Sequence, residues 1–314
     1  MKRNIKDLIG DVKFNQRSLI IGSAFSNMIV SMKSLPKVGD NIIGRLKDST
    51  LLGSAYNVAD ALGRFGANFD LMIPVGTGIN AKVVEDIFAD RGFISLIKED
   101  EIDNGLCISL LESNNDRAYI TIPGVEQNFK REWFDYYNPM DYDYFYISGY
   151  DLYGNNGTTI LEFFRRKTKD SKIIFDPGSN VDNIDKVVFD KILGMGTILT
   201  VNGEELFKIT KVGSIRDALM NIHKISKEPV IVRLGDRGAT VIENDEIYNV
   251  EGFRVDVVDK LSAGDAHTGT LIAGLSSSFT FEEAVYLANK VSSIVVSKVG
   301  NACSPTIDEL LSSL

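Results

Sequence analysis

The chain has 314 residues, of which 44% are apolar, and its 34 basic and 43 acidic side chains give a formal net charge of −9. This length allows a large buried core in one α/β domain or in two smaller ones. An acidic chain without a basic tail is a poor candidate for binding nucleic acid or an anionic membrane. No apolar run approaches the ~20 residues that span a bilayer, and the basic start at residues 1–7 has no apolar core of a signal peptide behind it.

Cysteine and histidine are scarce in this chain. Only Cys107 and Cys303 occur, far apart in the sequence, together with His223 and His267. This inventory argues against a disulfide framework or a zinc site and suits a reducing compartment. We therefore expect a soluble, cytoplasmic protein.

Strand-like and helix-like patterns alternate along most of the chain, which predicts a mostly parallel sheet with helices on both faces. Capping signatures at Ser214 and Thr280 predict the starts of two helices. Continuous apolar runs, typical of strands buried on both faces, occur at residues 19–21, 71–75, 173–175, 198–201 and 230–232.

Two stretches break this alternation. Residues 29–46 and 104–122 are typical of short strands, and the second pair is expected to turn at residues 113–116. Strands inserted between βα units usually leave the main sheet, so we expect these strands to stand apart from it. No linker is long enough to separate independent domains, which predicts a single domain over residues 1–314.

The segment Asp259-Lys260-Leu261-Ser262-Ala263-Gly264-Asp265 carries the most chemical information. It follows an alternating run at 253–257 that predicts a strand, and it precedes a small-residue stretch that predicts a helix. Small residues at such a turn leave the first N–H groups of the helix open, and with the helix dipole they form an anion site. Asp265 would repel a phosphate there unless it accepts a proton beside it, as in phosphoryl transfer to a hydroxyl. The alternative is a helix N-cap with a stabilising acid.

The segment resembles the Asp-Thr-x-Gly-Ala-Gly-Asp signature of the ribokinase-like (phosphofructokinase-B type) carbohydrate kinases. The resemblance covers roughly residues 17–312 and implies a three-layer α/β/α, Rossmann-like fold with a β-lid. It implies a kinase that transfers phosphate from ATP, with Mg²⁺, to a hydroxyl of a sugar or nucleoside, by family analogy a CH₂OH group. Further marks of the family follow in order at Gly22-Ser23-Ala24-Phe25-Ser26-Asn27, Leu35-Pro36-Lys37-Val38-Gly39-Asp40, Gly53-Ser54-Ala55-Tyr56-Asn57-Val58-Ala59, Asn202-Gly203-Glu204-Glu205 and Leu234-Gly235-Asp236-Arg237-Gly238.

At the reacting centre the resemblance makes Asp265 the general base that accepts the proton of the attacking hydroxyl. The N–H groups of Ser262, Ala263 and Gly264 would stabilise the charge that develops on the phosphoryl group. The family usually has threonine where Lys260 stands and often glycine or alanine where Ser262 stands.

At the nucleotide end the resemblance lets Asn202 and Glu205 hold Mg²⁺, mostly through water, although this pair is also a capping signature. Gly235 and Gly238 flank a turn that would contact the nucleotide, and a hairpin needs such glycines in any case. Asn289 matches a position that borders the adenine ring.

At the acceptor end Gly53, Ser54 and Asn57 match residues that approach the sugar. Asn27 stands where the family normally has an aspartate that receives two sugar hydroxyls. Asparagine keeps one acceptor and adds two donors, so this change weakens or redirects hydroxyl recognition. The resemblance therefore does not name the acceptor.

Two further properties are implied by the resemblance alone. Asp259, the carbonyl of Gly300 and the hydroxyl of Ser304 match a site for a monovalent cation such as K⁺ in some members. The β-lid often doubles as a dimer interface, which makes a homodimer the expected assembly.

A competing hypothesis rests on the glycines Gly76 and Gly78, which follow an apolar strand with Glu99 about twenty residues further on. This spacing fits a dinucleotide fingerprint and a nicotinamide-dependent oxidoreductase. The motif lies well inside the chain, and no residue set typical of hydride transfer accompanies it. A third hypothesis, a catalytically silent sugar-binding protein, is left open by Asn27. ADP release stimulated by one sugar or nucleoside would separate these classes.

Overall fold

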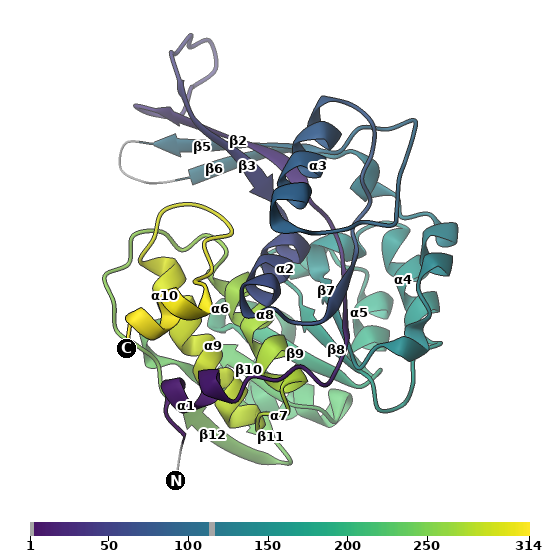
Figure 1. The fold of residues 1–314 in the computed structure, drawn as a ribbon, viewed down its shortest axis with the longest axis vertical. Helices are drawn as coiled ribbons and strands as arrows, with labels where there is room; N and C mark the ends of the chain where they lie inside the picture. Colours follow the sequence, from purple (N-terminus) through teal and green to yellow (C-terminus); the bar gives the residue numbers. More distant parts are fainter. Residues whose placement is uncertain (1–2, 113–116) are drawn as a thin grey trace.

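The computed structural model describes residues 3–112 and 117–314, which form a three-layer α/β body and a smaller second sheet (Figure 1). The strands of the main sheet follow the order β12-β11-β10-β9-β8-β7-β1-β4, and all pairs from β10 to β4 are parallel. β11 and β12 add an antiparallel edge. The strands are β1 (Ser18–Ile21), β4 (Phe69–Met72), β7 (Tyr144–Ser148), β8 (Lys172–Asp176), β9 (Thr197–Asn202), β10 (Val230–Arg233), β11 (Ala239–Glu243) and β12 (Glu246–Val250).

Helices cover both faces of this sheet because successive strand residues point to opposite sides. Ile20, Tyr146 and Ile174 join the core under α2, α8 and α9, whereas Leu19 and Phe145 join the core under α4, α5 and α7. The helices are α1 (Ile5–Gly10), α2 (Ser54–Phe65), α3 (Ile79–Arg91), α4 (Asn156–Phe164), α5 (Lys186–Leu193), α6 (Gly203–Thr210), α7 (Ile215–Ser226), α8 (Ala263–Ser276), α9 (Phe281–Val296) and α10 (Ile307–Ser312). Within the described ranges, none of them is long and apolar enough to cross a membrane.

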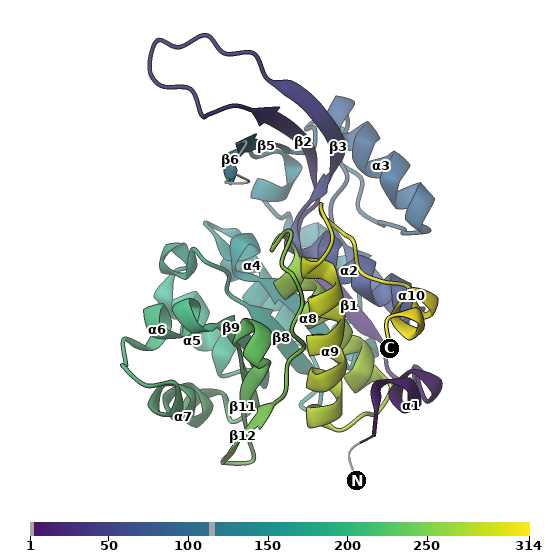
Figure 2. The ribbon, with the colours of Figure 1, turned by 90° about the vertical axis from the view of Figure 1, so that its left-hand side faces the viewer.

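The second sheet, called the lid, projects from the body beside α3 (Figures 1 and 2). Its strand order is β3-β2-β5-β6, in which β2 pairs with β5 in parallel and the outer pairs are antiparallel. The turn expected at residues 113–116 lies outside the described residues. The lid strands are β2 (Phe25–Met32), β3 (Arg45–Leu52), β5 (Leu106–Glu112) and β6 (Arg117–Ile122).

The fold class expected from the sequence is confirmed, since the five apolar runs lie in or overlap β1, β4, β8, β9 and β10. Ser214 and Thr280 cap α7 and α9 as expected. The strand expected at 253–257 is wrong, because this segment has no regular structure and pairs with no strand of the described residues. Its alternation has another cause: Phe253, Val255 and Val257 all line the large cavity described below.

Candidate active site

A cavity of about 1260 Å³ lies at the carboxyl ends of the parallel strands and extends to the lid. This crevice is where open α/β sheets usually bind ligands. Four of the residues expected at the site, Asn27, Asp259, Gly300 and Ser304, do not line it. The cavity does bring together Gly53, Ser54, Asn57, Asn202, Glu205, Gly235, Gly238, Ser262, Ala263, Gly264, Asp265 and Asn289.

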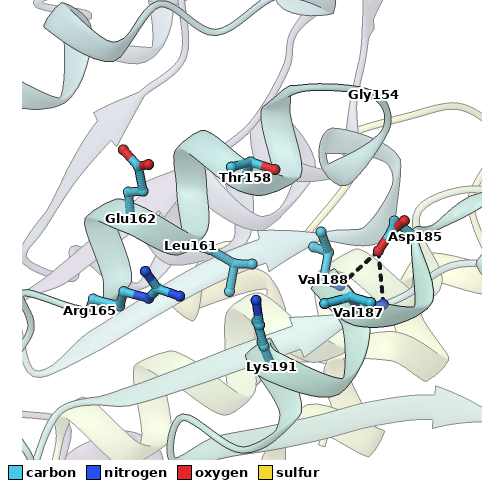
Figure 3. A pocket seen from close by; sticks show the side chains of 9 residues that line it. All are labelled: Gly154, Thr158, Leu161, Glu162, Arg165, Asp185, Val187, Val188 and Lys191. Carbon is cyan, nitrogen blue, oxygen red and sulfur yellow. Dashed lines mark hydrogen bonds between the residues drawn. The ribbon is translucent and has the colours of Figure 1, made fainter.

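A second cavity of about 240 Å³ lies between α4 and α5 in the outer helical layer (Figure 3). Arg165 and Lys191 share it with Glu162 and Asp185, so its lining carries both signs of charge. Asp185 already caps α5 by accepting from the N–H groups of Val187 and Val188. None of the expected site residues lies there, and we assign it no role.

The turn before α8 has the open backbone donors of an anion site. Ser262 adopts a left-handed conformation, with φ of 57°, and the helix begins at the next residue. Ala263 N–H donates to the Lys260 carbonyl at 3.4 Å, a long contact. No described carbonyl accepts from the N–H groups of Gly264 and Asp265, so these two donors face the cavity with the positive end of the helix dipole.

Asp265 lies at this same helix start and is oriented by α2. The Asn57 amide donates to Asp265 Oδ2 at 2.7 Å. Burial raises the pKa of Asp265 to about 7, and the Asn57 hydrogen bond opposes this shift. A carboxyl group with a pKa near neutrality is well matched to accept a proton from a hydroxyl and to release it again.

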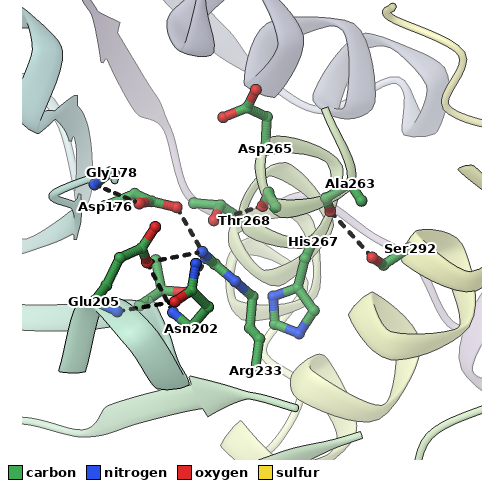
Figure 4. A network of polar contacts seen from close by, with 12 residues as sticks. Asp176, Gly178, Asn202, Glu205, Arg233, Ala263, Asp265, His267, Thr268 and Ser292 are labelled. Carbon is green, nitrogen blue, oxygen red and sulfur yellow. Dashed lines mark hydrogen bonds and ion pairs between the residues drawn. The ribbon is translucent and has the colours of Figure 1, made fainter. Parts of the chain in front are cut away.

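Below this turn lies a charged network that sequence reasoning missed (Figure 4). The Arg233 guanidinium, at the end of β10, donates through Nη1 to Asp176 at 2.8 Å and to the Thr200 hydroxyl at 2.7 Å. Its Nη2 lies 3.6 Å from Glu205 Oε2. The three charged residues lie at or just beyond the carboxyl ends of the neighbouring strands β8, β9 and β10, so their spacing in sequence gives no sign that they meet.

Asn202 and Glu205 form the capping box of α6. The Asn202 side chain accepts from Glu205 N–H at 2.9 Å, and Glu205 Oε2 accepts from Asn202 N–H at 2.8 Å. Burial raises the pKa of Glu205, and Arg233 opposes the shift. In the described part of the chain, no group of three acidic, histidine or cysteine side chains could hold a metal ion by itself.

The far end of the cavity, beyond α8, is apolar. Phe253, Val255, Val257 and Val296 line it near the β10–β11 turn at Gly235–Arg237. Asn289 closes this end by donating to the Glu251 carbonyl at 2.9 Å and contacting His267 Nε2 at 3.1 Å. Burial lowers the pKa of His267 to about 3, so this ring is neutral and is no general base at physiological pH.

The lid end of the cavity holds a second buried acid that sequence reasoning missed. Asp151 accepts a hydrogen bond from the Ser23 hydroxyl, and burial raises its pKa to about 7. Gly22 permits this approach, because a Cβ there would lie 2.6 Å from Asp151 Oδ2. The sequence signal available was an acid just after the end of β7, two residues beyond Gly149.

Asn27 does not reach the cavity. Asn27 pairs across the strands with Cys107, and Cys107 lines the cavity. The Asn27 side chain, by contrast, is fully buried within the lid. Its amide donates to the Thr50 hydroxyl at 3.1 Å and accepts from the Ser109 hydroxyl at 2.7 Å. These contacts place Asn27 as a link between β2, β3 and β5, at variance with the acceptor contact inferred from the family pattern.

We expect Asn27→Asp to destabilise the fold rather than to change acceptor choice. A buried carboxylate would lose the donor to Thr50, at a cost of about 1–3 kcal/mol of unfolding free energy. Urea denaturation at pH 8 measures the loss, and Asp190→Asn, on the exposed face of α5, is the control. A higher affinity for sugars with unchanged stability would show instead that residue 27 contacts the acceptor.

The cation site expected at Asp259, Gly300 and Ser304 is only partly assembled. Gly300 N–H donates to Asp259 Oδ2 at 3.1 Å, so these two residues meet. The same carboxylate oxygen accepts from Arg117 Nη2 of the lid at 2.6 Å, in an ion pair that is nearly buried. A guanidinium therefore already neutralises the carboxylate that the cation would need.

The glycines behind the nicotinamide hypothesis have another role. They precede α3, whose first N–H groups are already capped: Asp103 accepts from Asn80 N–H at 3.1 Å and from Ala81 N–H at 2.7 Å. Gly78 allows this approach, since a Cβ there would lie 2.4 Å from the Asp103 carboxyl carbon. A pyrophosphate would meet a carboxylate at this helix start, so the dinucleotide interpretation of Gly76 and Gly78 is wrong.

Comparison with known proteins agrees with this geometry. The family model for pfkB family carbohydrate kinases matches residues 21–307. The uncharacterized sugar kinase YegV of Escherichia coli (strain K12) is 30% identical, over 97% of this chain and 96% of its own. The aminoimidazole riboside kinase of Salmonella typhimurium (strain LT2) is 24% identical, over 80% of this chain and 79% of its own.

The fold comparison gives the same result. The ribokinase of Thermotoga maritima superimposes with a TM-score of 0.82 at 20% identity, covering 95% of this chain and 98% of its own. This chain belongs to the pfkB family of carbohydrate kinases, the ribokinase-like sugar and nucleoside kinases.

Proposed function

We propose that this protein transfers the γ-phosphoryl group of ATP to a hydroxyl, by family analogy a CH₂OH group, of a neutral sugar or nucleoside, with Asp265 as general base. The observation that carries the proposal is the position of Asp265. Its carboxylate lines the large cavity at the start of α8, beside open N–H donors. Such an acid fits a site that activates a hydroxyl next to an anion.

The residues present fit a nucleotide. The apolar end at Phe253, Val255 and Val257 suits a base, and the open donors of Gly264 and Asp265 suit phosphate oxygens. Mg²⁺ would be held through water by Glu205 and Asn202, and it would supply positive charge to the phosphates.

The lid end fits a polyhydroxy acceptor. Asp151 offers a carboxylate there, and Glu126 lines the same cavity with its carboxylate oxygens hydrogen-bonded to Asn104 and Gly105. An acceptor that already carries a phosphate or carboxylate would meet repulsion, which supports a neutral ligand. The named relatives, a ribokinase and an aminoimidazole riboside kinase, act on ribose-containing molecules by their names, and we extend that class to this chain.

A screen of neutral sugars and nucleosides for ADP release tests the proposal. One acceptor should stimulate ADP release with 1:1 formation of a phosphate ester, detectable by mass spectrometry. Acceptor binding without ADP release in the presence of Mg²⁺ and ATP would support a silent sugar-binding protein and contradict the proposal.

The exposed apolar side chains of the lid support a homodimer formed through it. Val38 and Ile43 lie in the β2–β3 loop, and Leu46 and Ile120 are about half exposed on the strands. Burying such a surface against a second copy is favourable. Light scattering measures the molar mass in solution and tests this proposal. The wild type should be a dimer, and Ile43→Asp, which places a charge in the interface, should be a monomer.

Monovalent-cation dependence should be governed by Arg117. Because its guanidinium already pairs with Asp259, we expect the wild type to work equally well in potassium and in tetramethylammonium salts. Arg117→Gln frees the carboxylate, and its activity should then rise specifically with potassium. Strong potassium activation of the wild type would show that the cation displaces Arg117 or binds elsewhere.

A further inference from the structure

The lining of the large cavity is acidic, although a triphosphate would have to bind in it. Six carboxylates line it, and only Arg233 and Lys260 among its described lining residues carry a positive charge. Lys260 is exposed in the loop before α8, whereas the Arg233 side chain is 15% exposed. A buried guanidinium is thus the fixed positive charge of the cavity floor.

The Arg233 guanidinium is hydrogen-bonded within the protein through Nη1, whereas Nη2 and Nε remain available. Asp176 and Thr200 accept from Nη1, which fixes the side chain against β8 and β9. Nη2 faces Glu205 at 3.6 Å, beyond hydrogen-bonding distance, and no hydrogen bond from Nη2 or Nε to a described residue is formed. A guanidinium has five N–H donors, so the remaining ones are available to a ligand.

These open donors lie directly against the anion turn. A Cβ on Gly264 would be 3.3 Å from Arg233 Nη2 and 3.4 Å from Cζ, so the planar group is in contact with the first turn of α8. Figure 4 shows the guanidinium between the Glu205 side and that helix. The backbone donors of Gly264 and Asp265 and the guanidinium donors therefore lie close enough to share one phosphate group.

We propose that Arg233 is a catalytic residue that binds the phosphoryl group during its transfer, with Asp176 as the residue that positions it. This inference rests on the proposed function and deepens it by naming the group that carries the developing charge. The bound phosphate replaces the missing partners of Nη2 and Nε. The competing explanation is structural: Arg233 only neutralises Asp176, the carboxylate to which it donates.

Arg233→Gln tests the proposal by two readouts. Turnover should fall on the order of 10²–10³-fold, the usual effect of losing a preorganised donor at a developing charge. Calorimetry without acceptor should show weaker binding of a non-hydrolysable ATP analogue and unchanged binding of adenosine. Arg233→Lys keeps the positive charge but loses the planar guanidinium with its several N–H donors. Compared with Arg233→Gln, it should recover part of the affinity for the analogue and little of the turnover.

The double variant Asp176→Asn/Arg233→Gln separates the two explanations. It removes the pair and leaves a neutral amide pair, so a structural role predicts restored analogue affinity and restored thermal stability. Under our proposal the double variant binds the analogue as weakly as Arg233→Gln does. Restoration in the double variant, or unchanged analogue affinity in a folded Arg233→Gln, overturns the proposal. Because these titrations contain no acceptor, they decide the role of Arg233 even if no acceptor is ever phosphorylated.

Discussion

Asp265→Asn should abolish most turnover while ATP still binds. The amide has the same shape but cannot accept the proton of the attacking hydroxyl, and loss of a well-placed base typically costs roughly 10²–10⁴-fold. Steady-state ADP release measures kcat, and calorimetry with the ATP analogue measures nucleotide affinity. Retention of most of the wild-type turnover by a folded variant would contradict the role of Asp265 as base.

The pH profile gives an independent check on the same residue. Since burial raises the pKa of Asp265 to about 7, the wild-type kcat/KM should fall as the pH is lowered through that value and the carboxylate becomes protonated. The residual activity of Asp265→Asn should keep only a shallower acidic limb, which comes from Asp151 with its pKa of about 7. Asp190→Asn, an exposed acid paired with Lys186 on α5, should leave the profile and the rate unchanged.

Asp151→Asn should weaken binding of the acceptor and leave binding of the nucleotide unchanged. The Ser23 hydroxyl can still donate to the amide oxygen, but hydroxyls of the acceptor lose a charged partner, and each such bond contributes about 1.5–3 kcal/mol. We expect kcat/KM for the acceptor to fall on the order of 10²-fold, with an unchanged KM for ATP. If only the KM for ATP changed, Asp151 would not contribute to binding of the acceptor.

The Asp151→Asn variant should gain stability although it loses acceptor affinity. A carboxyl group whose pKa is raised in the folded protein binds its proton more tightly there than in the unfolded chain, so stability falls as the pH rises through about 7. The amide carries no such dependence. Thermal melts at pH 5 and pH 8 should therefore show a larger gain in stability of Asp151→Asn relative to the wild type at the higher pH, whereas exposed Glu162→Gln should show no such dependence on pH.

Local signals explain which features could be predicted from the sequence. The turn at Ser262–Asp265 and the capping pair of Asn202 and Glu205 are contiguous in the chain, so their residue types already specify a helix start. The apolar strands were visible for the same reason. Their place around one cavity follows from strand order, because the carboxyl ends of parallel strands share an edge.

Features that depend on tertiary contacts were not predictable in this way. Arg233 and Asp176 are 57 residues apart and meet only because β8, β9 and β10 are adjacent. Asn27 occupies the position expected from the family pattern, yet Thr50 and Ser109 use its hydrogen-bonding groups. Residues 253–257 alternate like a strand because one side lines a cavity, and hydrophobic periodicity cannot distinguish these cases.

The parallel pairing inside the lid has a consequence for how the chain folds. Ser26 of β2 pairs with Leu106 of β5, and between them lie β3, α2, β4 and α3. Such a pair cannot nucleate as a local hairpin, since a long loop must be closed before the first contact forms. The hairpin of β5 and β6 can form early by itself, but β2 can join it only when the first half of the body is in place. The acceptor end of the cavity, which the lid completes, is therefore expected to be the last part of the site to form.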